Sequence, residues 1–264
     1  MSNPLRKLRS LASSMGIDLA RFGRSLRGIG PYFRNRSAFK KAAAGRTEFP
    51  FGKAYPCLFD RFESSAGGPA AGAYFHQDLH VAQLIHRNRP SRHVDVGSRV
   101  DGFVAHIAVF CPIDVYDIRP LTTSASNITF RQRDIMAERP DLDGSTDSLS
   151  CLHTLEHFGL GRYGDPIDYD GYLKGWESLY RMLKPGGKFY FSVPIGAQRI
   201  EFDGHRVFSV PFLVGMMHGK YRIDSFVYVN DAGDLVRDVS PTGPEAQSNF
   251  GCRFGCGIFE LTRI

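Results

Sequence analysis

Residues 93–120 read His-Val-Asp-Val-Gly-Ser-Arg-Val-Asp-Gly-Phe-Val-Ala-His-Ile-Ala-Val-Phe-Cys-Pro-Ile-Asp-Val-Tyr-Asp-Ile-Arg-Pro. The stretch contains two short apolar runs, each followed by an acid and a turn. Apolar runs of this length that are bounded by Gly or Pro are typical of buried parallel strands. The segment between them, Phe103 to Phe110, is long enough for one crossover helix. The pattern predicts a βαβ unit.

The two turns of this unit carry residues suited to binding a nucleoside. In a βαβ unit the first loop contains glycine, which lets the backbone approach a ligand, and here that glycine is Gly97. An acid about 20 residues further on, at the tip of the second strand, accepts hydrogen bonds from ribose hydroxyls. Asp117 stands 22 residues after Asp95. The spacing therefore predicts a cofactor that contains ribose.

The chain beyond the βαβ unit adds the strands of a larger α/β sheet. Ser148 to His153 is an apolar run, and Leu183-Lys-Pro-Gly-Gly187 ends a helix and leads into a strand at Lys188 to Pro194. A third strand is expected at Ile128 to Arg131, and Gly257 to Ile264 forms a late strand.

This combination of motifs resembles the class I S-adenosylmethionine (AdoMet)-dependent methyltransferases over roughly residues 74–264. That superfamily has an Asp-x-Gly-x-Gly loop, an acid after the second strand, a Leu-x-Pro-Gly-Gly turn and a C-terminal strand hairpin. Glu156-His-Phe-Gly-Leu-Gly-Arg-Tyr-Gly-Asp-Pro166 closely resembles the signature of a methyltransferase-like family associated with bacterial surface-polysaccharide loci. The resemblance implies a Rossmann-like α/β fold with a mostly parallel seven-stranded sheet and an antiparallel last strand.

The resemblance also implies the cofactor and the residues that hold it. The loop after the first strand would bind AdoMet, Asp117 would hold the ribose, and Asp134 would contact the adenine. The helix before the first strand would lie over the mouth of the site, where Tyr74, Gln77 or Asp78 can reach the methionine end. The implied cofactor-binding set is Asp95, Gly97, Ser98, Asp117, Asp134, Gln77 and His153.

The glycine loop departs from the superfamily pattern, because Arg99 and Asp101 stand where glycine is expected. Side chains there leave less room for the backbone to cradle a cofactor. The alternative is therefore a catalytically degenerate, methyltransferase-like interaction module in polysaccharide assembly. A nicotinamide-binding domain fits less well, because Gly97 is not followed by the Gly-x-Gly-x-x-Gly pattern.

Residues His153-Thr-Leu-Glu-His157 match His-x-x-Glu-His, the zinc signature of inverted metallopeptidases. Two histidines four apart bind zinc in this way only on one face of a continuing helix. Here a strand is expected to end near His153, and the glycines of Phe158-Gly-Leu-Gly161 would break a helix at once. The context disfavours a peptidase.

In the methyltransferase interpretation the same residues lie beside the sulfonium of the cofactor. Transfer to a hydroxyl requires a base, and histidine suits this role near neutral pH. We assign His157 as the base, with Glu156 orienting it and His205 facing the same mouth. Alternatively, Glu156, His157 and His205, with His153, hold a divalent metal that lowers the pKa of a sugar hydroxyl.

The segment 159–170 is rich in glycine, tyrosine and aspartate, a composition suited to binding a polar acceptor by hydrogen bonds and stacking. A solvated surface loop is the alternative. Arg206 is expected on the opposite wall, where it can pair with a carboxylate or phosphate. The predicted acceptor-binding residues are Arg162, Tyr163, Asp165 and Arg206. By the family resemblance, the predicted reaction is O-methylation of a glycan or glycolipid precursor.

Basic charge is concentrated at the N-terminus. Residues 1–46 contain 11 Lys and Arg against one acid, Asp18, whereas the remainder contains 22 Lys and Arg against 26 Asp and Glu. Apolar residues spaced three and four apart predict an amphipathic helical arm over 1–45, then a linker over 46–73 and the methyltransferase-like domain over 74–264. The arm suits an anionic membrane surface, an acidic assembly partner or a structural cap. No nucleic-acid partner is expected, because aromatic interleaving and groove-reading motifs are missing from its sequence.

The composition is that of a globular protein, with 42% hydrophobic and 23% charged residues. The sequence contains no apolar run of 18 residues and no apolar signal core, so neither a membrane span nor secretion is expected. Its five cysteines are an odd number without zinc-site spacing. We expect a cytoplasmic protein that can lie at the inner membrane through its arm.

Overall fold

The computed structural model divides into two units, Met1–Gly68 and Pro69–Ile264, and each is considered by itself. The structure describes residues 11–42, 56, 58, 72–121, 124–161, 163–201 and 204–264. Residues 1–10 and 43–45 of the expected arm, and most of the expected linker 46–73, lie outside this part of the chain.

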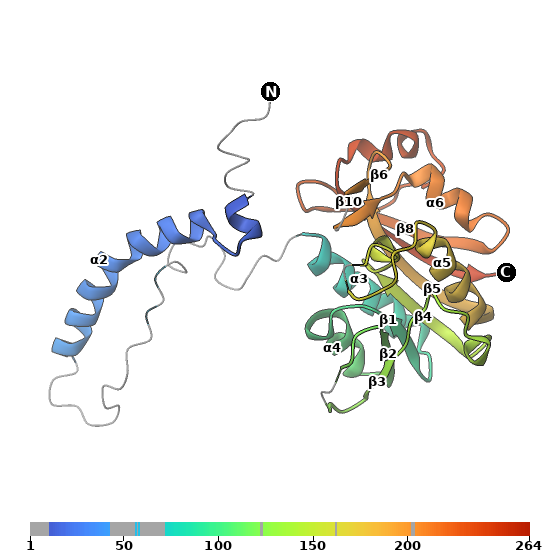
Figure 1. Ribbon diagram of the computed structural model, residues 1–264, viewed down its shortest axis with the longest axis horizontal. Coiled ribbons are helices and arrows are strands. Elements are labelled where there is room, and N and C mark those ends of the chain that lie inside the picture. Colours follow the sequence, from blue (N-terminus) through green and yellow to red (C-terminus); the bar gives the residue numbers. More distant parts are fainter. Residues whose placement is uncertain are drawn as a thin grey trace. The chain divides into compact units, whose positions relative to one another are not determined.

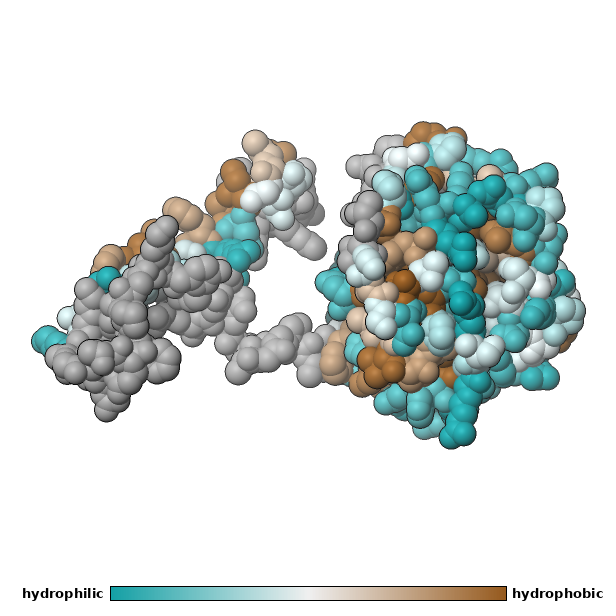
Figure 2. Space-filling model, turned by 90° about the horizontal axis from the view of Figure 1, so that it is seen from below, coloured by the Kyte–Doolittle hydropathy of each residue, from teal (hydrophilic) through white to brown (hydrophobic). Residues whose placement is uncertain are grey.

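The first unit contains the helix α2 (Leu19–Ala42), which agrees with the amphipathic pattern of the arm. Asp18 precedes the helix, and its carboxylate accepts a hydrogen bond from the Arg21 amide at 2.9 Å. An acid at this position satisfies one of the amide groups that the first turn leaves without a partner. Hydrophobic residues lie along one edge of the helix (Figure 2).

The second unit is built on one eight-stranded sheet in the order β3-β2-β1-β4-β5-β10-β8-β9 (Figure 1). Strands β1 to β5 pair in parallel, whereas β10 is antiparallel to both β5 and β8. The strands are β1 (His93–Val96), β2 (Ile113–Asp117), β3 (Ile128–Gln132), β4 (Thr146–Leu152), β5 (Leu183–Ile195), β8 (Tyr221–Val229), β9 (Leu235–Val236) and β10 (Gly255–Arg263). This confirms the predicted fold class. The two-residue β9 extends the expected seven strands by one.

Helices cover both faces of the sheet (Figure 1). On one face α3 (Ala73–Asn88) and α4 (Ala105–Ala108) contribute Val81, Ile85 and Ile107 to a buried cluster. On the other face α5 (Gly171–Met182) and α6 (Val210–Met217) contribute Trp176, Leu179 and Leu213 to a second cluster. A separate hairpin, β6 (Arg199–Glu201) with β7 (His205–Val207), was not expected from the sequence.

The crossover between β1 and β2 is less helical than predicted. Instead of one helix over 103–110, a π-helical turn η2 (Val100–Val104) leads into the short α4. Gly102 lies in this turn, and a Cβ atom there would come within 2.5 Å of the Asp78 carboxylate on α3. The glycine therefore allows α3 to pack closely against the turn.

A buried polar chain joins β1 to β4. The His93 ring lies 2.8 Å from Ser148 Oγ and 2.9 Å from Ser150 Oγ, and Ser150 in turn donates a hydrogen bond to Asp95. Burial lowers the pKa of His93 to about 3. The ring is therefore neutral and is held between the two serines. These hydrogen bonds fix the position of β1 against β4 at the centre of the sheet.

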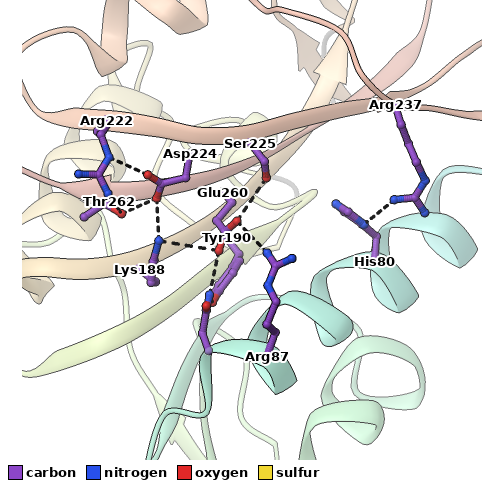
Figure 3. Close-up of polar contacts among 11 residues, drawn as sticks. His80, Arg87, Lys188, Tyr190, Arg222, Asp224, Ser225, Arg237, Glu260 and Thr262 are labelled. Atoms are coloured by element: carbon purple, nitrogen blue, oxygen red, sulfur yellow. Dashed lines mark hydrogen bonds and ion pairs between the residues drawn. The ribbon is translucent and has the colours of Figure 1, made fainter.

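A second polar network fastens the end of α3 to the antiparallel side of the sheet (Figure 3). The buried Glu260 of β10 accepts hydrogen bonds from Asn88 at 2.8 Å and from Arg87 at 3.5 Å, and Asn88 also donates to Tyr190 Oη at 2.7 Å. Since a buried carboxylate is costly without partners, these bonds allow Glu260 to lie in the sheet. The network fixes the position of α3.

His80 of α3 predicts how stability responds to acid. Burial, with Arg237 and Arg87 nearby, lowers the pKa of His80 to about 4, below its ordinary 6.5. The unfolded chain therefore binds the proton first, so His80 stabilises the fold at neutral pH and loses this contribution between pH 6.5 and 4. The free energy of unfolding should fall between pH 7 and 4.5 in both proteins. We expect this fall to be about 2 kcal/mol smaller in His80→Gln than in the wild-type protein.

Urea unfolding of the variant and the wild-type protein at the two pH values measures this difference. Glutamine keeps an acceptor for Arg237, which donates to His80 Nδ1 at 3.3 Å (Figure 3). His93 titrates in the same direction in both proteins and cancels in the comparison. Equal losses in the two proteins would show that His80 does not control the response.

Candidate active site

A cavity of about 240 Å³ opens at the carboxyl ends of β1, β2 and β4 and below the first turns of α3. Open α/β sheets bind their ligands at this edge, because the loops that follow parallel strands meet there. The cavity is lined by most of the residues predicted for the site, namely Gln77, Gly97, Ser98, Asp117, Asp134, His153, His157, Tyr163 and Asp165. Four other predicted residues lie in the described part of the chain but do not line the cavity: Asp95, Glu156, His205 and Arg206. Arg162 is outside the described residues.

The loop after β1 is held from behind by Asp95. Its buried carboxylate accepts hydrogen bonds from the Ser98 amide at 3.0 Å and from Ser98 Oγ at 2.7 Å. Burial raises the pKa of Asp95 to about 6, although the bonds from Ser150 and Ser98 oppose this shift. Asp95 therefore shapes the cofactor loop without lining the cavity.

Gly97 makes the closest approach between the two central loops. Its φ is +74°, and a Cβ atom would lie 2.4 Å from Cγ2 and 2.9 Å from Oγ1 of Thr154, which follows β4. Only glycine fits at this position without moving Thr154.

Arg99 and Asp101 replace the expected glycines without filling the cavity. Arg99 has ordinary extended backbone, with φ −66° and ψ 128°. The two side chains pair with each other at 3.0 Å and are 61% and 75% exposed. Arg99 is among the residues that line the cavity, and its guanidinium lies 5.7 Å from the centre of the Tyr74 ring. The departure from the superfamily pattern therefore leaves room for a ligand.

Asp117, the expected ribose ligand, is bound on both oxygens by Arg119. Its Oδ1 accepts from the Arg119 amide at 2.8 Å and from Nε at 2.9 Å, and Oδ2 accepts from an Nη at 2.7 Å. The same guanidinium lies 4.9 Å from the centre of the Tyr163 ring. Sequence reasoning missed Arg119, and its position two residues after the acid is the only signal that could have indicated it.

The expected adenine and methionine contacts come from different segments of the chain, and both line the cavity. Asp134 follows β3 and accepts a hydrogen bond from the Met136 amide at 2.9 Å. On α3, Gln77 accepts from Ser192 Oγ at 2.5 Å and donates to Asp78 at 3.0 Å. Burial raises the pKa of Asp78, although the bond from Gln77 opposes the shift. Acids from α3, from the end of β2 and from the segment after β3, namely Asp78, Asp117 and Asp134, therefore line the cavity.

His153 directly follows β4 and has a left-handed backbone, with φ +48°. Its Nδ1 lies 2.9 Å from Oε1 of Glu156, which is 1% exposed. Burial of the His153 ring opposes its charge, but Cys256 and Glu156 outweigh this and hold the pKa of His153 well above its ordinary value. We attribute the shift mainly to the close Glu156 carboxylate.

His157 belongs to the 3-10 turn η4 (Leu155–His157) and lines the cavity. Its Nδ1 donates to the Gly204 carbonyl at 2.7 Å, which fixes the tautomer of the neutral ring. Nε2 is then the nitrogen that can accept a proton, and it lies 3.9 Å from Glu156 Oε1. Since η4 is only three residues long, His153 and His157 do not share the helix that a zinc peptidase needs.

The predicted metal set of Glu156, His157 and His205 does not form. The β6–β7 hairpin directs the Gly204 carbonyl toward His157, whereas the His205 ring pairs with Glu201 at 3.2 Å and packs 4.7 Å from Phe254. Within the described part of the chain, no group of three His, Cys, Asp or Glu side chains can hold a metal ion.

The glycine-rich loop is folded around Asp165. Its carboxylate accepts hydrogen bonds from the amides of Gly159 at 2.8 Å, Gly161 at 3.1 Å and Tyr163 at 3.1 Å. Three such bonds fix the loop, which places Tyr163 at the cavity with its ring 5.3 Å from that of His157.

Arg206 supports this loop instead of facing an acceptor. Its buried guanidinium donates to the carbonyls of Phe158 at 2.6 Å and Tyr169 at 3.0 Å, and it lies 4.9 Å from the centre of the Tyr172 ring. The expectation of an anion-binding side chain does not match this geometry, because Arg206 lies outside the cavity and is occupied by backbone carbonyls.

A family model described as "Caenorhabditis protein of unknown function, DUF268" matches residues 125–237. No curated protein matches the chain. Among solved structures, the N-methyltransferase NodS from Bradyrhizobium japonicum WM9, in complex with S-adenosyl-L-homocysteine, has a TM-score of 0.50 at 14% identity and covers 73% of this chain and 88% of that one. A structure described as a sarcosine dimethylglycine methyltransferase from Galdieria sulphuraria has a TM-score of 0.50 at 15% identity, with 71% and 84% covered. The chain therefore has the Rossmann-like fold of these methyltransferases.

The packing around Gly97 predicts that adding a single methyl group at this position greatly lowers the stability of the fold. We expect Gly97→Ala to lower the free energy of unfolding by about 3 kcal/mol, because it combines unfavourable φ with overlap against Thr154. Gly186→Ala is the matched control, since Gly186 has φ +77° and open space around it. That variant should cost only about 1 kcal/mol. Chemical unfolding of both variants measures the difference, and equal costs would contradict a tight approach between the two loops.

Proposed function

We propose that this protein is an AdoMet-dependent methyltransferase that methylates a hydroxyl group of a glycan or glycolipid precursor. The observation that carries the proposal is the cavity itself. It lies at the carboxyl ends of the central strands of a methyltransferase fold and places Asp117, Asp134 and His157 on its walls. The carbohydrate acceptor is inferred from the resemblance of the 156–166 segment and from the polar and aromatic loop 159–170, which overlaps it.

The residues of the cavity suit each part of AdoMet. Asp117 at the tip of β2 offers carboxylate oxygens to ribose hydroxyls, and Asp134 offers one to the adenine amino group. Asp78 and Gln77 on α3 suit the ammonium group of the methionine end. The buried Glu156 Oε2 has no hydrogen-bond partner among the described residues. This oxygen, beside the cavity, therefore still needs a hydrogen-bond donor.

When bound, AdoMet supplies an electrophilic methyl group on its sulfonium. In the proposed reaction the acceptor oxygen would bond to this methyl carbon as the carbon–sulfur bond breaks, and the electron pair would stay on sulfur. His157 accepts the hydroxyl proton at Nε2, and the Gly204 carbonyl holds the opposite N–H. Glu156 stabilises the resulting imidazolium from 3.9 Å. Tyr163 and Asp165 form the wall on the acceptor side.

One observation favours the degenerate interaction module as the second candidate. Arg119 occupies both oxygens of Asp117, so a ribose must share or displace these bonds. Calorimetric titration with AdoMet and S-adenosylhomocysteine separates the two functions, because a degenerate module binds both compounds weakly or not at all.

The ribose assignment predicts that Asp117→Ala weakens AdoMet binding roughly 10- to 150-fold, because a charged acceptor of hydroxyl hydrogen bonds contributes about 1.5 to 3 kcal/mol. The matched control is Asp101→Ala, which removes an exposed acid paired with Arg99 outside the ribose site. Calorimetry should show the control within about twofold of the wild-type protein. Unchanged affinity in the Asp117 variant would rule out this cofactor orientation.

The base assignment predicts that His157→Asn lowers turnover by about 10² to 10⁴ with AdoMet affinity nearly unchanged. Asparagine can still donate to the Gly204 carbonyl but cannot accept the proton. The fall in rate at acidic pH should also disappear. His205→Asn is the control, because His205 pairs with Glu201 outside the cavity, and it should keep turnover within about threefold.

Release of S-adenosylhomocysteine is measured with a panel of nucleotide sugars and lipid-linked saccharides as acceptors. Equal losses in both histidine variants would contradict the assignment of His157. AdoMet binding without turnover on any member of the panel would contradict a carbohydrate acceptor.

A further inference from the structure

The helix α2 exposes a continuous apolar stripe. Five large apolar residues recur at spacings of three and four and are between 41% and 64% exposed: Leu19, Phe22, Leu26, Ile29 and Phe33. Residues at these spacings lie on one face of a helix. Hydrophobic residues are seen along this edge in Figure 2. Exposed apolar side chains grouped in this way mark an interaction surface.

The charge of α2 has a single sign. The helix contains seven Lys and Arg, at positions 21, 24, 27, 34, 36, 40 and 41, and no Asp or Glu. The acid nearest to its start, Asp18, accepts a hydrogen bond from the Arg21 amide at the first turn. The helix therefore combines an apolar stripe with charged side chains that are all basic.

We propose that α2 docks in the plane of an anionic lipid bilayer. Its apolar stripe would enter the boundary between headgroups and acyl chains, and its arginines would contact lipid phosphates. None of the described helices has the length and apolarity to span a bilayer, so a position along the surface is the one that suits α2. Arginine matches phosphate well, since its planar guanidinium binds two phosphate oxygens at once.

The stripe favours lipid over a nucleic acid as the anionic partner. A nucleic acid would be bound by the basic residues alone and would leave five large apolar side chains in water. A lipid surface buries those side chains and neutralises the arginines together. The inference depends only on α2, so it is independent of the proposed methyl transfer.

The test compares two variants of the full chain that add the same charge to opposite sides of α2. Phe33 lies in the stripe, seven residues after Leu26. The exposed Asn35 lies nine residues after Leu26, which is two and a half turns, so it is on the opposite side of the helix. The two variants are Phe33→Glu and Asn35→Glu. The probe is a phosphatidylcholine vesicle with about one third phosphatidylglycerol, and binding is measured by co-sedimentation. Asn35→Glu should weaken binding about fivefold through charge, and Phe33→Glu at least about fiftyfold.

Far-UV circular dichroism establishes that the variants keep their helix. Should Phe33→Glu lose helicity, Phe33→Ser replaces it, because it removes the apolar ring without adding charge. Wild-type binding should also weaken with salt and be much lower on pure phosphatidylcholine. Equal weakening by the two charge variants, equal binding to neutral vesicles, or binding to RNA without binding to vesicles would each overturn the proposal.

Discussion

The hydrogen bonds of the Asp95 carboxylate connect the fold to the site. Asp95 is fully buried in β1, binds Ser98 of its own loop and accepts a bond from Ser150 of β4. Through Ser150 the connection continues to His93. An unpaired carboxylate at this depth would be prohibitive, so these partners are a condition of the fold. The same bonds hold the β1 loop close to the residues that follow β4, where Gly97 meets Thr154. The two walls of the cavity are therefore linked behind the site by one acid.

The sequence was sufficient to predict those parts of the fold and of the site whose positions depend on where the strands end. Apolar runs predict the central strands, and parallel strands bring their carboxyl ends to one edge whatever their side chains are. Asp117, Asp134 and His157 accordingly line one cavity, as expected. The departures arise where a short turn decides the direction of a side chain. His205 and Arg206 lie in a hairpin without an apolar signature, and only the structure shows that the Gly204 carbonyl faces His157. Arg119 was missed because a long side chain after a strand can reach in many directions.

A line of contacts runs along the cavity from Asp117 to His157. Arg119 binds Asp117 on both oxygens and stacks on Tyr163, whose ring meets the edge of His157. Tyr163 is held in turn by the bond from its amide to Asp165. Because aromatic and cation–π contacts of this kind depend on ring position, we expect a change at Asp117 to alter the packing of the loop that carries Tyr163. Asp117 and Tyr163 therefore share Arg119, although they come from different segments of the chain.

The distribution of charge gives α2 a physical role in the proposed chemistry. Beyond residue 46 the chain contains 22 Lys and Arg against 26 Asp and Glu, so this part carries net negative charge. An anionic bilayer repels such a body over a distance of about one Debye length, roughly 8 Å at physiological salt. If the acceptor is a lipid-linked saccharide, as proposed, the enzyme must nevertheless remain at that surface. A basic helix with an apolar stripe overcomes the repulsion locally, because each arginine near the surface contributes about 1 kcal/mol and the buried stripe adds a term that salt does not screen. The two proposals thus assign membrane binding and catalysis to separate parts of one chain.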